Sequence, residues 1–124
     1  MISVSEEDFQ KFIESAMDSI PEQFKEKLEN IVFIVEDYPS VHDLERLSLK
    51  HREQLLGLYS GTPYTHRNTY YMGTIPDRII LFQKNIESIC SSIDQLKNKI
   101  KEVIIHEIAH YFGMNETEIR KAGF

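Results

Sequence analysis

The chain has one cysteine, no tryptophan and no long hydrophobic run. Cys90 has no partner for an internal disulfide, and the opening MISVSEEDFQ has neither the basic start nor the apolar run of a signal peptide. Together these two absences predict a cytoplasmic protein. The longest apolar run, IVFIV, is far shorter than the roughly 20 residues that span a bilayer, so no membrane segment is expected.

Basic residues are also fewer than acidic ones. The sequence has 14 Lys and Arg against 20 Asp and Glu, a formal net charge of -6. Nucleic-acid binding depends mainly on clustered Lys and Arg, so we expect no nucleic-acid partner. The length of 124 residues and the 41% hydrophobic content predict one globular domain over 1–124.

Hydrophobic periodicity predicts helices and strands in one chain. The spacing predicts a helix over 5–20 with Ser5 as its N-cap, and a second helix over 21–30. A long amphipathic helix is expected from Ser92 to Gly113, and a short helix or turn over 85–92. Apolar, β-branched runs predict a buried strand over 31–39, a short strand within 55–64 and a strand over 78–83. Residues 40–54 fit either a short helix or an ordered loop, because their leucines follow no single period.

The long helix ends in HEIAHYFGMNE, residues 106–116. His106 and His110 are four residues apart, so both imidazoles can face one metal ion from the same side of a helix. Glu107 is then placed to meet a water held by the ion. Gly113 allows the chain to turn back, so that Glu116 can return as a third ligand.

With these residues the chain resembles the zincin metallopeptidases, in particular small ones with a minimal zincin-like domain. VEDYP at 35–39, LLGLYSGTPYTHR at 55–67 and IPDRIILFQ at 75–83 resemble other recurrent stretches of that family, in the same order. The resemblance implies a compact α+β fold, with a small mixed sheet packed against the helix that carries the motif. It also implies a bound zinc ion (Zn²⁺) and peptidase activity.

The sequence does not decide which residue is the third metal ligand. In the metzincin pattern a histidine stands where this chain has Glu116, so Glu118 and the upstream His66 remain alternatives. With three protein ligands and one open position, zinc lowers the pKa of a water to about 7, and Glu107 can act as the general base. Candidates for stabilising the developing oxyanion are Tyr59, Tyr64, His66, Arg67, Tyr71 and Arg78.

Three further residues receive simpler interpretations. Asp77 follows Pro76 and is expected to be a turn residue more than a partner of a metal-binding histidine. Gly57 suggests a bulge or a close approach by substrate, and Cys90 is expected to be a buried apolar residue.

The sequence therefore predicts a zinc-dependent peptidase acting on a peptide or protein. Its substrate would lie antiparallel along an exposed sheet edge, at RIILFQ or at LLGLY. Two alternatives remain, namely a zinc-dependent hydrolase of nucleic acid or a small molecule, and an interaction module in which zinc only stabilises the fold.

Overall fold

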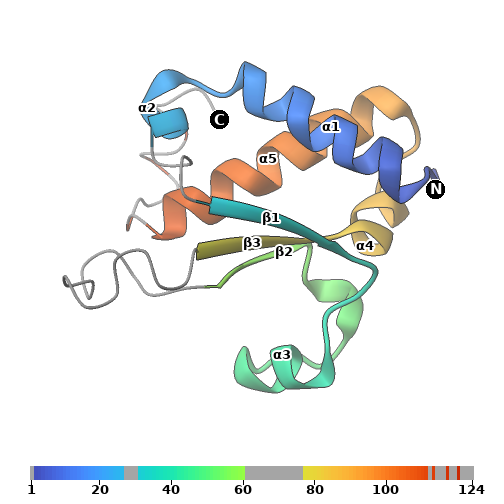
Figure 1. Ribbon diagram of the computed structural model, residues 1–124. Coiled ribbons are helices and arrows are strands. Elements are labelled where there is room, and N and C mark those ends of the chain that lie inside the picture. Colours follow the sequence, from blue (N-terminus) through green and yellow to red (C-terminus); the bar gives the residue numbers. More distant parts are fainter. Residues whose placement is uncertain are drawn as a thin grey trace.

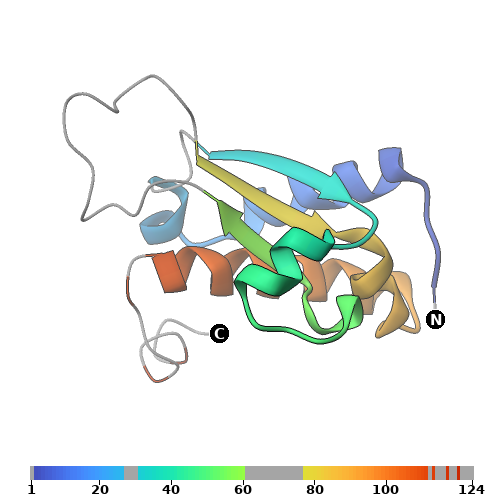
Figure 2. The ribbon, with the colours of Figure 1, turned by 90° about the horizontal axis from the view of Figure 1, so that it is seen from below.

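The computed structural model describes residues 2–26, 31–60, 77–111, 113, 117 and 120. Helices and a three-stranded mixed sheet make up one α+β unit, so the predicted fold class is confirmed. The strand order is β1-β3-β2. Helices α1 (Glu6–Ser19) and α5 (Ile93–Tyr111) lie on one side of the sheet and α3 (Val41–Arg46) on the other (Figure 1; Figure 2).

The two N-terminal helices begin where the sequence predicts. The Ser5 hydroxyl accepts a hydrogen bond from the Asp8 N–H at 3.0 Å, which caps α1 and satisfies a donor that the first turn leaves open. Helix α2 (Glu22–Lys25) follows Pro21, and the rest of its predicted span, 27–30, lies outside the described residues.

The sheet has β3 (Asp77–Phe82) at its centre. It pairs in parallel with β1 (Ile31–Glu36) and antiparallel with β2 (Gly57–Ser60). The prediction of a fully buried strand over 31–39 is therefore wrong, because β1 ends at Glu36 and is an edge strand with Val32 45% exposed. The suggestion that RIILFQ offers a sheet edge is also wrong, because both edges of β3 are already paired. LLGLY, which contains part of β2, remains as an edge.

The connector between β1 and β2 contains more regular structure than its leucines indicate. A capping box formed by Ser40 and Asp43 starts α3, and the short 3-10 helix η2 spans Arg52–Gln54. The buried Asn85 amide, in α4 (Gln83–Ser88), donates to the carbonyls of Arg52 at 2.5 Å and Leu55 at 2.7 Å. These bonds tie the end of the connector to α4, which sets the position from which β2 begins.

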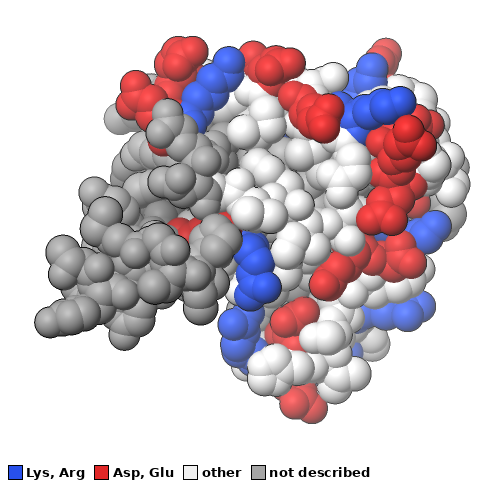
Figure 3. Space-filling model, in the orientation of Figure 1, with Lys and Arg blue, Asp and Glu red and all other residues white. Residues whose placement is uncertain are grey.

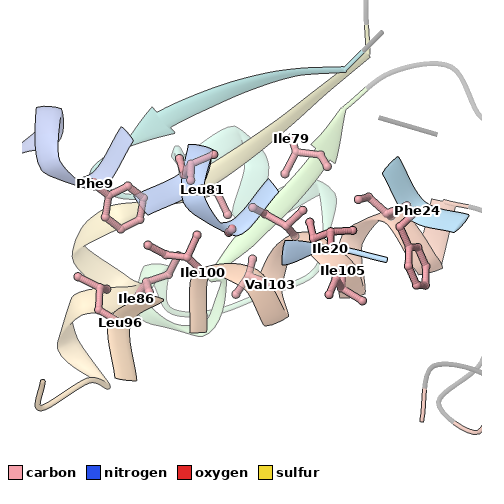
Figure 4. Close-up of a cluster of buried hydrophobic side chains, with 14 of the residues drawn as sticks. Phe9, Ile20, Phe24, Ile79, Leu81, Ile86, Leu96, Ile100, Val103 and Ile105 are labelled. Atoms are coloured by element: carbon pink, nitrogen blue, oxygen red, sulfur yellow. The ribbon is translucent and has the colours of Figure 1, made fainter. Parts of the chain in front are cut away.

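Helix α5 provides much of the hydrophobic core. Leu96, Ile100 and Ile104 are fully buried, as their spacing predicts. Figure 4 shows the side chains of α5 close to those of β3 and α1, including Ile79, Leu81 and Phe9, and Cys90 is buried in the same cluster. Each large apolar side chain buried in this way contributes about 1.5 to 3 kcal/mol. The helix that carries the motif is therefore held rigidly against the sheet.

The end of α5 also follows the prediction. Gly113 has φ +73°, the left-handed conformation in which a glycine avoids the strain of a side chain, and its N–H donates to the His110 carbonyl at 3.1 Å.

The face shown in Figure 3 has acidic and basic side chains around an uncharged area over β1. Both signs of charge are interspersed at its margin. Within the described residues, no helix has both the length and the apolar character that crossing a bilayer requires.

Candidate metal and catalytic site

The two motif histidines lie one turn apart near the end of α5. The centroids of the His106 and His110 rings are 6.2 Å apart and their planes are nearly perpendicular, at 83°. Zinc binds imidazole nitrogen at about 2.0 to 2.1 Å, so two such bonds plus half a ring on each side can bridge a separation of this size. His106 is half-buried and His110 is exposed. The two imidazoles are therefore within reach of one shared zinc ion, on a side of the helix that is open to solvent at His110.

The third ligand cannot be placed among the described residues. In that part of the chain, no three His, Cys, Asp or Glu side chains form a group that could hold a metal ion. Glu116 and its alternatives Glu118 and His66 all lie outside the described residues. Glu116 as third ligand stays a prediction.

The side chain of Glu107 faces β2. The backbone N–H of Tyr59 donates a hydrogen bond to its carboxylate. Burial raises the pKa of Glu107 to about 7, and the Tyr59 N–H opposes that rise by stabilising the charged form. A carboxyl group with a pKa near neutrality can both accept and return a proton at physiological pH.

A glycine allows β2 to come this close to α5. A Cβ added to Gly57 would meet Val103 Cγ1 at 2.6 Å and the Ile80 carbonyl oxygen at 3.4 Å, and it would lie 3.6 Å from Glu107 Cγ. The sequence indicated a bulge or a close approach by substrate at this position. The close neighbour is instead the protein's own helix, and any side chain larger than hydrogen would push β2 away from Glu107.

A pocket of about 190 Å³ opens between α5 and the start of β2. Its lining residues come from two segments, and they are Leu55, Leu56 and Gly57 together with Lys99, Glu102, Val103, His106 and Glu107. Of these residues, His106 and Glu107 were predicted from the motif, whereas Lys99 and Glu102 were not. Lys99 is seven residues and Glu102 four residues before His106, so both lie on the same side of the helix as His106, which was the available signal.

Asp77 is a strand residue with a structural partner, so the turn interpretation is wrong. It is the first residue of β3, it is only 7% exposed, and its carboxylate accepts a hydrogen bond from the Tyr59 hydroxyl at 2.5 Å. The Tyr59 hydroxyl is thus engaged across the sheet. Tyr59 therefore connects β3 to Glu107: its hydroxyl bonds to Asp77 in β3, and its backbone N–H bonds to the Glu107 carboxylate.

Arg78 does not belong to the site. It lies between Asp77 and Ile79, which are buried on the α5 side, so its side chain points to the opposite face of the sheet. There its Nη2 lies 3.4 Å from the Ser60 hydroxyl. The other proposed oxyanion stabilisers, Tyr64, His66, Arg67 and Tyr71, lie outside the described residues.

The model of the zincin-like metallopeptidase family matches residues 28–123, which include the sheet, the pocket and the whole motif. The chain belongs to the zincin-like metallopeptidase family. No curated protein matches it. Membership supports a metallopeptidase and makes zinc the expected metal, and it agrees with the way in which the zincin-like chain brings His106, His110 and Glu107 to one end of α5.

Proposed function

We propose that this zincin-like protein is a zinc-dependent peptidase. His106, His110 and Glu116 hold the metal, and Glu107 is the general base. The observation that carries the proposal is geometric: His106 and Glu107 line one pocket beside an edge strand, and the Tyr59 N–H holds the Glu107 carboxylate in place. A histidine pair that served only to stabilise the fold would need no such carboxylate next to it.

A bound zinc ion would acidify a water molecule and polarise the substrate carbonyl. The chain's own residues supply the proton transfers. Glu107 accepts a proton from the attacking water and returns it to the amine that leaves when the peptide bond breaks. The hydrogen bond from Tyr59 fixes one side of the carboxylate, so the orientation of the carboxylate does not depend on substrate.

The free edge of β2 offers a place for the substrate backbone. The Phe82 N–H donates to the Leu56 carbonyl at 3.0 Å, so by the alternation of an antiparallel ladder Leu58 and Ser60 also bond towards β3. The backbone N–H and C=O groups of Gly57 and Tyr59 then point away from β3, towards the free edge of β2. An extended peptide can pair with Gly57 without any demand on its own sequence, while the Tyr59 N–H serves Glu107.

The test separates metal binding from catalysis. Purified protein should contain about one zinc per chain by elemental analysis, and His106→Ala together with His110→Ala should remove it. Glu107→Gln should keep zinc near the wild-type level, while peptide hydrolysis falls about 10²-fold to 10⁴-fold. Glu116→Gln should weaken zinc binding first, so that excess zinc partly restores activity.

The matched control is Asp94→Asn, the same chemical change in the first turn of α5, which should alter neither zinc content nor hydrolysis. A peptide library and an RNA substrate, each with and without chelator, distinguish peptidase from nuclease activity. Full zinc content in the double alanine variant, or loss of zinc in Glu107→Gln, would contradict the assigned roles.

A further inference from the structure

The pocket extends from the motif in one direction only. Gly57 lies against Val103, and the Tyr59 N–H bonds to Glu107, so β2 and this part of α5 run in the same direction. Leu55 and Leu56, which precede β2, therefore lie towards the N-terminal side of α5, where Lys99 and Glu102 line the same pocket. Figure 2 shows β2 alongside α5 in this arrangement.

The direction of a bound peptide follows from this arrangement. Antiparallel pairing is the more stable arrangement per residue, so a substrate on the edge of β2 runs opposite to β2. With its scissile bond at Glu107, its residues on the C-terminal side pass Gly57 and then Leu55, towards Lys99. The described lining of the pocket contains one side chain with a permanent positive charge, and it is that of Lys99.

We propose, building on the peptidase function above, that Lys99 binds the free C-terminal carboxylate of the substrate. Seven helical residues from Lys99 to His106 span about 10 Å, which is about three residues of extended peptide. A chain that ends about three residues after the scissile bond therefore places its carboxylate at Lys99. The substrate class is peptides with a free C-terminus, from which the enzyme removes short C-terminal fragments.

The charges around Lys99 allow this role. Its ammonium group lies 3.1 Å from the Glu102 carboxylate, and the side chain of Lys99 is 30% exposed against 52% for Glu102. An ion pair this exposed contributes little, so a substrate carboxylate can share or replace Glu102 as the partner of Lys99. The apolar walls from Leu55, Leu56 and Val103 reduce the screening of that contact by water.

The test measures binding, independently of turnover. One peptide is made as the free acid and as the C-terminal amide, and the affinity of zinc-loaded Glu107→Gln for each is measured by calorimetry. A charge-assisted hydrogen bond predicts that the acid binds about tenfold more tightly than the amide. Lys99→Met should remove that preference, and Lys99→Arg should keep most of it. Glu102→Gln should increase it, because the ammonium group loses its competing partner.

The control is Lys97→Met, which removes a charge from the same helix. The Lys97 ammonium lies over the Phe12 ring, 5.2 Å from its centroid, outside the pocket, so the preference should persist. Equal affinities for acid and amide, or no binding of either, overturn the proposal. So does a preference for a free over an acetylated N-terminus, because that would mean the peptide runs the other way. Zinc-dependent cleavage of internal bonds in amidated peptides would leave the peptidase function intact while this assignment fails.

Discussion

Replacing Gly57 by alanine should separate the edge strand from the helix that carries the motif. The new Cβ would lie 2.6 Å from Val103 Cγ1, closer than packed carbon atoms come, and Val103 is itself buried. Overpacking of this kind costs about 1 to 3 kcal/mol. Alanine loses less conformational entropy on folding than glycine does, which offsets about 0.5 to 1 kcal/mol of that cost. We expect a net loss of about 1 to 2 kcal/mol in the free energy of unfolding.

Urea denaturation at 25 °C measures this loss. With a slope of about 1.5 kcal/mol per molar urea, the midpoint should fall by about 1 M. A double-mutant cycle with Val103→Ala identifies the cause, because that change removes the atom with which the new Cβ collides. Val103→Ala alone should cost about 1.5 to 3 kcal/mol through lost burial. If the collision is the cause, the double variant should lose about 1 kcal/mol less than the sum of the two single variants. Strict additivity, or a Gly57→Ala protein as stable as wild type, would refute the reasoning.

Two further predictions concern the buried side chains of Asn85 and Cys90. Asn85→Asp, which keeps the shape of the side chain but removes its two N–H donors, should reduce the free energy of unfolding by about 1 to 3 kcal/mol, because two carbonyls of the connector lose their partner. Unchanged stability in that variant would show that the amide is not the donor. Cys90 should not react with Ellman's reagent at pH 8 in the native protein but should react fully in denaturant, because it is 2% exposed and burial raises the pKa of its thiol. Rapid reaction of the native protein would contradict the burial of this side chain.

Local signals account for the parts of the fold that were predicted well. The long helix could be bounded because its core residues repeat at helical spacing and because Gly113 supplies the left-handed stop. Ser5 was identifiable as an N-cap from its hydroxyl and the acidic residues after it. The short helix α3 also had a local signal, the Ser40 and Asp43 capping box, but its leucines obscured it.

Strand order was the part that the sequence could not provide. The parallel pairing of β1 with β3 joins residues more than 40 positions apart, and no periodicity within either strand specifies its neighbour. The apolar run of β1 predicted burial on both faces, but edge position leaves Val32 exposed. For the same reason the partner of Asp77 could not be inferred, since Tyr59 reaches it only after β2 has paired with β3.

The site depends on those same non-local pairings. His106 and Glu107 can be recognised from their spacing alone, but the carboxylate is oriented by a backbone N–H, which no side-chain pattern encodes. That N–H points towards α5 because Leu56 and Phe82 set the register of the ladder, and it comes within reach because Gly57 has no side chain. A chain with the same motif and a larger residue at position 57 would keep its histidine pair but lose the contact that orients the Glu107 carboxylate. In this zincin-like protein the motif therefore indicates the family, while the register of one short edge strand determines how the Glu107 carboxylate is held.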